Sequence, residues 1–334
     1  MILFRTTASV LILLVAACAT CVAAEDKQKT AEVLLEHARQ LSDIRSPNAP
    51  AFRLNVHFSF VAEDLDTIQG TYTEVWVTNS QWRRESVVGN SRRIEVDGPN
   101  KRWIADGGKE FPQQATRVST MVDIFPPRFA KFEFESFKDR DPSTQCAITK
   151  PGLAKGRHGF CFDKHSGMLV ENIVPDFIGQ RVADHSCRYG MFQKFGDYWF
   201  PREMACFVDT HRKIEAKVSE LSLESSPDAA LFTPPAGALE IGNCSLSPVP
   251  PRPVFEPDPK FPSGIRDRTS SVVLWMIVDT KGKPHDITVA RSGGKAFDDS
   301  AVSTVRSWRF KAGTCNGEPM PMQINVEVRF RLYQ

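Results

Sequence analysis

The sequence has 334 residues and a mass of 37.4 kDa, long enough for two domains that each bury a hydrophobic core. Hydrophobic residues make up 41% and charged residues 25%, which excludes a disordered chain, a collagen-like fibre and a protein with many membrane spans. Lys and Arg number 42 against 40 Asp and Glu. Because a net charge of +2 gives no excess positive field to hold a phosphate backbone, nucleic acid is not expected as a partner.

The N-terminus predicts export. Arg5 is the one charge among the first 24 residues, and small and apolar residues continue to Ala24 before the charges begin at Glu25. This pattern is typical of a cleaved signal peptide over residues 1–24. A retained membrane anchor and a lipoprotein modified at Cys18 are the alternatives. Cleavage after Ala24 removes Cys18 and Cys21 together and leaves an even set of six cysteines, whereas modification at Cys18 would leave Cys21 unpaired.

The six remaining cysteines predict disulfides, because an exported chain meets an oxidising environment. We expect sequential pairing: Cys146 with Cys161, Cys187 with Cys206, and Cys244 with Cys315. Metal binding is the competing interpretation. No pair has the close Cys-x-x-Cys spacing, and the nearby His158, His165 and His185 do not complete a four-ligand set. We therefore expect neither a metal nor a cofactor.

The first long region reads as a helix followed by a large antiparallel sheet. Apolar residues at helical spacing predict a helix within residues 25–46, and residues 47–240 form the predicted sheet domain. From Phe52 to Phe60 the hydrophobic period becomes two, which indicates a strand with one buried face. A second helix is predicted over 115–125, covering the sheet. The sheet is expected to have about ten strands, the later ones at 70–78, 82–88, 92–96, 102–105, 145–150, 157–163, 168–174, 185–195, 202–208 and 213–223.

Spaced motifs in this region carry a first resemblance. They are Gly70-x-Tyr72-x-Glu74-x-Trp76, Trp82-Arg83-x-Glu85, Gly196-x-Tyr198-Trp199-x-Pro201 and Leu231-Phe232-x-Pro234-Pro235. Together they resemble the LolA-like family of periplasmic lipoprotein carriers. The resemblance implies a curved antiparallel half-barrel, closed by helices, whose concave face forms an apolar groove for acyl chains.

Six aromatic residues are candidates to line one face of such a groove: Phe58, Phe60, Tyr72, Trp76, Trp82 and Trp103. A plain packed core is the alternative interpretation of the same residues.

A proline-rich segment at residues 241–262 predicts an extended linker. It contains seven prolines, which are too many for a helix or a central strand: Pro248, Pro250, Pro251, Pro253, Pro257, Pro259 and Pro262. The composition differs on its two sides, so a second domain is expected over 263–334.

The sequence predicts that this second domain is small and has an α+β fold. Strands are predicted over 269–279 and 285–291, joined by a hairpin turn, and a last strand over 322–332. Between them, the spacing of Phe297, Ala301, Val305 and Trp308 predicts a helix with one apolar face, and Asp298 is the expected N-cap.

The same region carries the sharper resemblance. Its motifs are Phe261-Pro262, Val278-Asp279-x-x-Gly282-Lys283, Ala290-Arg291-Ser292-Gly293-Gly294, Phe297-Asp298, Trp308-Arg309-Phe310, Asn316-Gly317 and Val328-Arg329-Phe330-Arg331-Leu332. These motifs resemble the C-terminal domain of the energy-transducer TonB family. The resemblance implies a small domain that uses its sheet edge to hold a short peptide of an outer-membrane receptor. Phe261 stands where the family usually has tyrosine, and Leu13 stands where the leader would need histidine for pairing with inner-membrane motor proteins.

Two functions remain, and both place the protein in the periplasm. The first is an interaction protein that contacts an outer-membrane receptor or another envelope protein through the final strand and supports transport across the outer membrane. Its expected partner-binding side chains are Gln323, Asn325, Glu327, Arg329 and Arg331. The alternative is a carrier that binds lipid or lipoprotein acyl chains in the half-barrel. Nucleophile, zinc and dinucleotide motifs are missing from the sequence, so catalytic residues and an enzyme are not expected.

Overall fold

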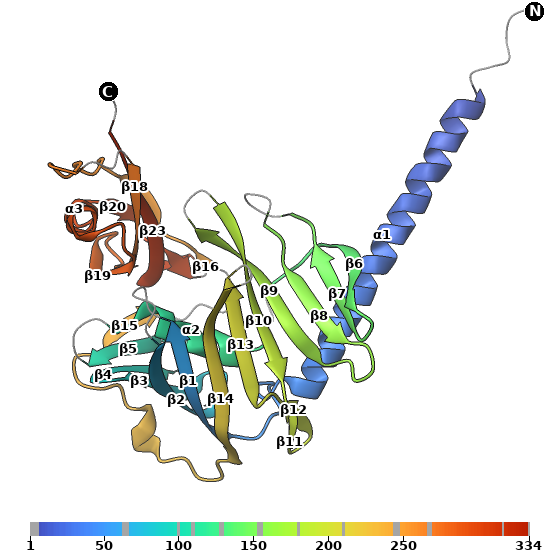
Figure 1. The fold of residues 1–334 in the computed structure, drawn as a ribbon, viewed down its shortest axis with the longest axis horizontal. Coiled ribbons are helices and arrows are strands. Elements are labelled where there is room, and N and C mark those ends of the chain that lie inside the picture. The colour runs from blue at the N-terminus through green and yellow to red at the C-terminus, as the bar shows by residue number, and fades with distance from the viewer. Residues whose placement is uncertain are drawn as a thin grey trace, which may run out of the picture. The chain divides into compact units, whose positions relative to one another are not determined.

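The computed structural model describes residues 7–61, 67–98, 101–107, 111–126, 130–151, 156–178, 181–208, 211–242, 248–265, 269–315 and 317–332 (Figure 1). Contacts between residues divide the chain into two units. Unit 1 consists of Met1–Ala49 and Met121–Lys217, and unit 2 consists of Pro50–Thr120 and Val218–Gln334. None of the helices within the described residues combines the length and hydropathy that a membrane crossing requires.

One sheet of thirteen strands dominates the chain, in the order β15-β5-β4-β3-β2-β1-β14-β13-β10-β9-β8-β7-β6. Neighbouring strands run antiparallel wherever their register is defined, and the sheet is curved (Figure 1). A small α+β region follows at the C-terminal end. The predicted fold class, mainly β with a small C-terminal α+β domain, is therefore confirmed.

Unit 1 packs a long helix on antiparallel strands. Helix α1 (Thr7–Ser42) places Ala31 and Ala38 at full burial against Phe160, and Gln28 hydrogen-bonds the backbone of Phe132 and Phe134 beside the edge strand β6. The strands are β6 (Phe134–Asp141), β7 (Thr144–Thr149), β8 (Gly159–Asp163), β9 (Leu169–Ile178), β10 (Arg181–Gly190), β11 (Gln193–Phe195), β12 (Tyr198–Phe200) and β13 (Glu203–Val208). Strand β14 (His211–Leu223) continues into unit 2.

Two segments of unit 1 differ from the sequence-based expectation. Helix α1 begins at Thr7, inside the segment predicted to be a signal peptide, and not near residue 25. The side chains of residues 1–24, including Cys18 and Cys21, lie outside the described residues, so cleavage after Ala24 stays a prediction. The strand expected over 185–195 ends at Gly190, because Met191 takes a positive φ of 53° and the chain turns into the β11–β12 hairpin.

Two of the expected disulfides are present in unit 1. Cys146 of β7 bonds Cys161 of β8, and Cys187 of β10 bonds Cys206 of β13. Each pair consists of residues directly opposite each other on neighbouring antiparallel strands. Cys315 of unit 2 is also disulfide-bonded, but Cys244 lies outside the described residues, so that third pairing stays a prediction.

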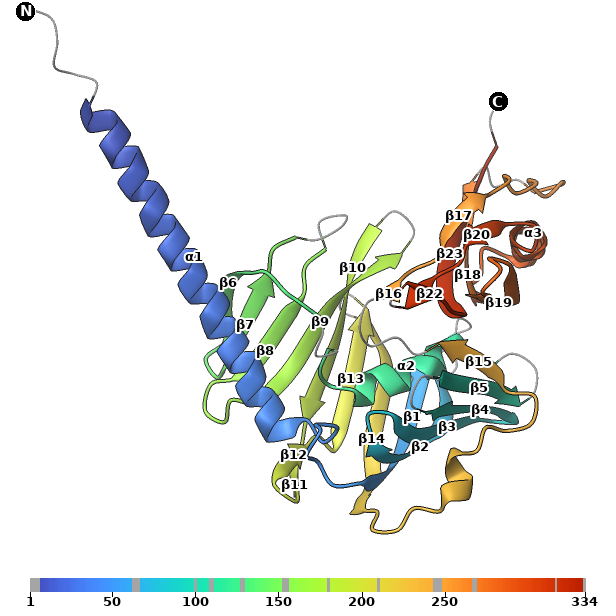
Figure 2. The ribbon, with the colours of Figure 1, turned by 180° about the vertical axis from the view of Figure 1, so that it is seen from behind.

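Unit 2 begins with a meander of five strands. They are β1 (Phe52–Val61), β2 (Thr67–Thr78), β3 (Gln81–Val88), β4 (Ser91–Asp97) and β5 (Lys101–Gly107), and β15 (Leu239–Gly242) adds to β5. Burial along β1 alternates as its period of two predicts, with Phe52, Leu54 and Val56 inside. Helix α2 (Gln113–Val122) lies across these strands and buries Ala115 and Val118 (Figure 2).

The C-terminal region of unit 2 holds a three-stranded sheet, β18 (Thr269–Val278), β19 (Pro284–Arg291) and β23 (Met322–Arg331), together with helix α3 (Lys295–Val305). Alternate residues of β18 and β23 form a core with Phe297, Ala301 and Val305 of the helix. Asp298 is not the N-cap, which is Gly294. Asp298 instead lies in the first helical turn and accepts hydrogen bonds from the Ser292 hydroxyl and the Gly293 amide.

The proline-rich segment contains two short strands that pair with later parts of the chain. After the short helix η2 (Ala229–Phe232) and β15, it forms β16 (Pro248–Val249) and β17 (Arg252–Phe255). Strand β16 pairs with β21 (Thr314–Cys315), which also pairs with β22 (Glu318–Pro319), and β17 pairs with β20 (Arg309–Lys311). Proline is tolerated here because β16 and β17 are edge strands, where one side of the backbone needs no partner.

Candidate functional site

The strand expected to bind a partner lies at a sheet edge. The C-terminal sheet has the order β19-β18-β23, and β23 pairs with β18 over its whole length, from Met322 opposite Val278 to Arg331 opposite Thr269. Within the described residues no strand pairs with the other side of β23. Its outward backbone N–H and C=O groups can therefore accept a further strand.

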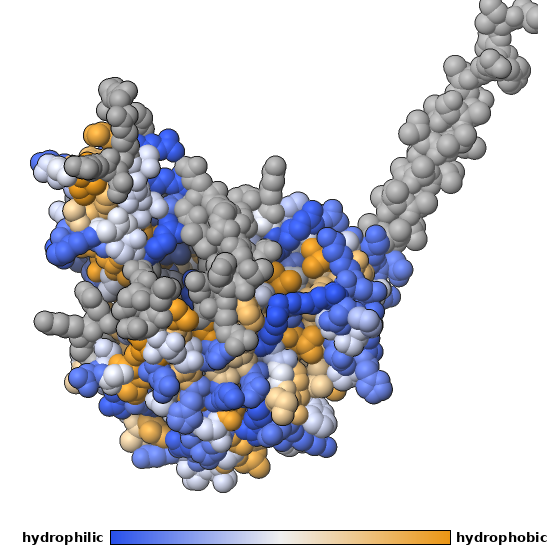
Figure 3. All heavy atoms as spheres, viewed as in Figure 1, coloured by the Kyte–Doolittle hydropathy of each residue, from blue (hydrophilic) through white to orange (hydrophobic). Residues whose placement is uncertain are grey.

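The side chains of β23 divide between two faces. Ile324, Val326, Val328 and Phe330 point toward the core that contains α3. Gln323, Asn325, Glu327, Arg329 and Arg331, the predicted partner-binding residues, alternate with them on the opposite face. Four of these five are exposed, and Glu327 is half-buried. Hydrophilic residues cover much of the side of this region where β23 lies (Figure 3).

Glu327 is held in an ion-pair network across the sheet. Its carboxylate accepts a hydrogen bond from Arg291 Nη2 at 2.9 Å and lies 2.8 Å from Arg329 Nη2. Arg291, from β19, also donates to the Ser271 hydroxyl at 3.1 Å. Burial opposes ionisation of Glu327, but the hydrogen bond from Arg329 and the two guanidinium charges outweigh it and lower the pKa of this carboxyl.

Most of the residues predicted to line an apolar groove are buried. Phe58, Phe60, Tyr72, Trp76 and Trp82 are each at most 8% exposed. Phe52 stacks on Trp76 with ring centroids 5.5 Å apart, and Phe58 stacks on Phe60 at 6.4 Å. A side chain at Gly70 would lie 2.4 Å from Phe58 Cζ, so the motif glycine leaves room for that ring.

Trp103 does not share this face, contrary to the sequence-based expectation. In the register of β4 and β5, Ile104 lies opposite Glu95, whereas Trp103 lies opposite Val96. Because side chains alternate across a strand, Trp103 belongs with Val96 on the other face of the sheet.

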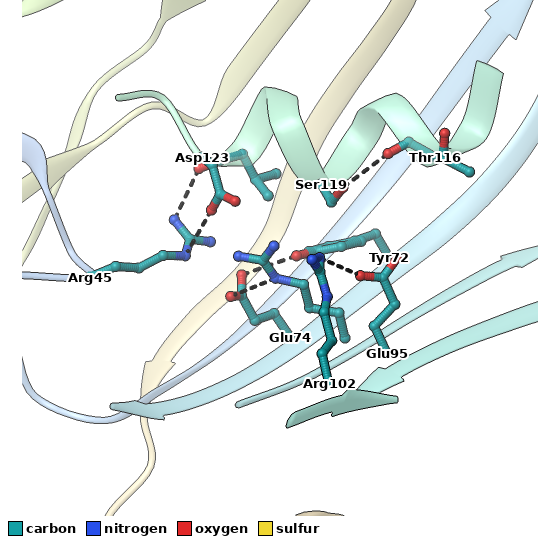
Figure 4. Close-up of polar contacts among 10 residues, drawn as sticks. Arg45, Tyr72, Glu74, Glu95, Arg102, Thr116, Ser119 and Asp123 are labelled. Carbon is teal, nitrogen blue, oxygen red and sulfur yellow. Dashed lines mark hydrogen bonds and ion pairs between the residues drawn. The ribbon is translucent and has the colours of Figure 1, made fainter. Parts of the chain in front are cut away.

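Charged residues share the helix-covered face with the aromatic ones. Glu74 of β2 lies opposite Arg84 of β3, and Arg84 lies opposite Glu95 of β4. Arg93 and Arg102 complete a group of five, here called the charged cluster: Glu74, Arg84, Arg93, Glu95 and Arg102. Figure 4 shows four residues of this meander, Tyr72, Glu74, Glu95 and Arg102, on the side of the strands that α2 crosses.

Each carboxylate of the charged cluster is neutralised by guanidinium groups. Arg84 Nε lies 3.1 Å from Glu74, which also accepts a hydrogen bond from the Tyr72 hydroxyl at 3.1 Å. Glu95 accepts from Arg93 Nε and from Arg102 Nη2, both at 2.9 Å. The guanidinium groups of Arg84 and Arg102 also lie over the Trp82 ring, 4.4 Å and 5.3 Å from its centroid.

The pKa of Glu95 shows what this cluster can do chemically. Burial would raise it, but the charges of Arg102, Arg93 and Arg84 outweigh burial and lower the pKa to about 2. A carboxylate held so firmly in its ionised form is a poor proton donor or acceptor near neutral pH. The arrangement therefore fits a structural role better than acid–base chemistry.

Sequence reasoning missed the charged cluster and the Arg291–Glu327 pair. A usable signal was present for the first, because Glu74 lies between Tyr72 and Trp76 in the strand alternation and so had to share their buried face.

A hollow of about 420 Å³ does occur, but in unit 1 and on other residues. It lies over β10, β13 and β14, and its lining includes Arg188, Glu203, Glu215 and Lys217. Tyr189, Met204, Ala205 and Ala216 also line the hollow, which therefore combines apolar surface with two cations and two carboxylates. It contains none of the residues predicted for the apolar groove.

One group of side chains has a spacing that could suit a metal ion. Potential ligand atoms of His185, Cys187 and Cys206 lie within 4.8 Å of one another. The two cysteines form a disulfide, however, so neither offers the thiolate that a metal would bind.

Comparison with known families assigns the C-terminal region. Residues 262–332 match the family of the Gram-negative bacterial TonB protein C-terminal. The matched range contains β18, β19, α3 and β23, and so the whole three-stranded sheet and its edge. The TonB-like resemblance of the final region is thereby confirmed. No curated protein has a sequence that matches this chain.

Solved structures similar to the chain include a LolA superfamily protein and a DUF1329 family protein. A lipoprotein-sorting protein domain from Vibrio parahaemolyticus, described as putative, is 14% identical with a TM-score of 0.39, covering 60% of this chain and 97% of its own. A LolA superfamily protein from Nitrosomonas europaea is 14% identical with a TM-score of 0.40, covering 61% and 97%. A DUF1329 family protein from Desulfovibrio piger is 10% identical with a TM-score of 0.43, covering 60% and 96%. At these values the likeness does not indicate what this chain binds.

Proposed function

We propose that this chain is a non-enzymatic interaction protein of the bacterial periplasm. Its C-terminal region binds an extended segment of an outer-membrane receptor or another envelope protein, which adds as a further strand to β23. In this way it supports transport across the outer membrane. The family match of residues 262–332 supports an envelope protein, and the composition of residues 1–24 supports export.

The observation that carries the proposal is the edge position of β23. Ten consecutive residues pair with β18 on one side, and within the described chain no strand pairs on the other. Main-chain hydrogen bonds to a regular edge of this length give affinity without a deep pocket. The exposed polar side chains along β23 keep such an edge soluble while it is unoccupied.

The carrier alternative has less support from the residues named for it. Five of the six predicted groove residues are buried, and the sixth lies on the other face. Glu74, which is fully buried, lies on the same face. Acyl chains would have to displace this packing and leave ionised groups in contact with hydrocarbon.

Hydrogen exchange of the full chain tests the proposal. The probes are synthetic peptides that cover the periplasm-facing N-terminal segments of outer-membrane receptors, each compared with a copy that is N-methylated at alternate residues. Backbone pairing predicts protection of β23 amides by the unmodified peptide and loss of protection after methylation, because methylation removes the peptide's donors. Protection of another surface, with β23 unchanged, would overturn the assignment.

A protein variant gives the complementary measurement. Asn325→Pro removes a backbone donor from the middle of β23 and should abolish peptide binding. Asn325→Ala removes the side chain and keeps the donor, so it should retain binding. Thermal unfolding of both variants shows whether a loss of binding comes from the altered edge of β23 or from unfolding of the C-terminal region.

A further inference from the structure

The two faces of β23 present different chemistry to an added strand, and this difference specifies the partner segment. The inference rests on the proposed function, since it concerns what pairs with the same edge. On one face lie the apolar residues that join the C-terminal core, and on the other lie amides and charged groups.

Apolar surface remains uncovered on the inner face of β23. Val328 and Phe330 are each 2% exposed, whereas Ile324 and Val326 pack on the same core but are only partly buried. These two residues lie at the sheet edge, where no described strand pairs with the free side of β23. An added strand would place every second side chain beside them, and apolar side chains there would complete the burial.

The outer face of the same strand carries excess positive charge. Arg291 and Arg329 flank Glu327 and neutralise it, with contacts of 2.9 Å and 2.8 Å. Arg331 is exposed, and among the described residues it forms no ion pair. This face therefore carries three guanidinium groups, of Arg291, Arg329 and Arg331, and one carboxylate, of Glu327. The Arg329 side chain is 51% exposed, so it can reach a neighbouring strand.

We propose that the β23 edge selects an extended protein segment in which apolar and acidic residues alternate. Its apolar side chains lie beside Ile324 and Val326, and its carboxylates lie beside Arg329 and Arg331. The period of two along β23 requires the same period in the partner, because side chains on neighbouring strands share faces. Opposite charges directly across a pair of strands favour the complex, and like charges oppose it.

Three amidated ten-residue peptides test this on the full chain. Each has valine at alternate positions, with glutamate, serine or lysine between. We expect the glutamate peptide to bind about fivefold more tightly than the serine peptide, the scale of two exposed cross-strand charge pairs, and the lysine peptide to bind most weakly. The preference should shrink between about 0.05 M and about 0.5 M salt, because exposed charges are screened.

Charge-reversed variants assign the preference to β23. Arg331→Glu breaks no described ion pair and should lower the advantage of the glutamate peptide, and the double variant Arg329→Glu, Arg331→Glu should favour the lysine peptide. The matched control is Lys311→Glu, an exposed charge reversal on β20 that should leave the order of affinities unchanged. An equal change of the peptide affinities in Lys311→Glu would overturn the assignment to β23.

Hydrogen exchange in the same samples separates this inference from the proposed function. If all three peptides protect β23 amides with equal affinity, strand addition holds and the acidic preference is wrong. If no peptide protects β23 at any salt concentration, both are wrong. Preferential binding of the glutamate peptide without β23 protection would assign the charge preference to a different surface.

Discussion

Glu74 and Arg84 face each other on β2 and β3, with Arg84 Nε 3.1 Å from Glu74 Oε1 and the glutamate side chain fully buried. The pair lies among the aromatic residues that the sequence suggested for an acyl-chain groove. Removing two charges from water costs free energy, which their attraction offsets only when the remaining polar atoms are also satisfied. The Tyr72 hydroxyl supplies one such hydrogen bond. The meander is therefore sensitive to loss of either partner.

Glu74→Gln should destabilise the protein by about 3 kcal/mol, because Arg84 then keeps its charge in a buried site with one fewer counter-ion. Chemical denaturation monitored by tryptophan fluorescence measures the change. Glu240→Gln is the matched control: its ion pair with Lys101 has side chains 44% and 54% exposed, so the loss should be below about 1 kcal/mol. A similar loss in both variants would show that burial of Glu74 does not determine its effect.

Replacing both partners should be less harmful than replacing one. In the double variant Glu74→Leu, Arg84→Met no unpaired charge is left, so stability should recover relative to Glu74→Gln. If the double variant is less stable than Glu74→Gln, the attraction between Glu74 and Arg84 outweighs the free-energy cost of burying their charges.

The low pKa of Glu95 predicts that the protein loses folding stability as the pH falls. The folded pKa of about 2 lies below the ordinary value of 4.5, so the unfolded chain binds more protons as pH falls. The contribution of Glu95 is full above about pH 4.5 and is lost as pH falls toward 2. Glu95→Gln should therefore remove on the order of 3 kcal/mol at pH 7 and much less near pH 2. Urea unfolding at a series of pH values measures this difference. An equal loss of stability in the parent protein and in Glu95→Gln as the pH falls would contradict the prediction.

Strand alternation was sufficient to predict the faces of the meander, but it did not identify the chemistry between strands. The period of two from Phe52 to Phe60 gave β1 and its buried side correctly. The pairing of Glu74 with Arg84 depends also on register, which the short turn between β2 and β3 sets. Trp103 was placed on the wrong face because that placement needs the register of β4 and β5, which its own strand does not contain.

Strand pairing between distant segments could not be predicted from the local sequence pattern. Pro248 lies opposite Cys315, and Pro253 lies opposite Phe310, across long stretches of chain. Prolines interrupt the period of two in this segment, so no local pattern marks it as β-structure. The final strand was predicted more fully, because its alternation of apolar and polar residues is regular.

Reduction should destabilise unit 1 through its two cross-strand disulfides. Cys146–Cys161 and Cys187–Cys206 close loops with sequence separations of 15 and 19. Each should contribute about 2 to 4 kcal/mol by restricting the unfolded chain. Thermal unfolding of Cys187→Ser, Cys206→Ser against the parent protein measures one bridge at a time. An unchanged melting temperature would contradict the expected contribution.

Non-reducing peptide mapping should also join Cys244 to Cys315. Cys315 is disulfide-bonded in the structure, and the sequential pattern assigns Cys244 as its partner. A mapped bond between Cys315 and any other cysteine would rule out that assignment.

Gly282 should tolerate no side chain. It has φ of 74°, and an added Cβ would lie 1.8 Å from the Phe310 carbonyl oxygen, while the Gly282 carbonyl accepts a hydrogen bond from the Phe310 amide at 2.9 Å. Gly282→Ala should therefore destabilise the C-terminal region by about 3 kcal/mol or more, through both backbone strain and displacement of β20. Gly264→Ala is the matched control, because Gly264 has φ of 79° with nothing within 4 Å of the added atom, and about 1 kcal/mol is expected. Hydrogen exchange of β18 amides measures both variants; equal losses would show that backbone conformation alone, and not the contact with Phe310, requires glycine at position 282.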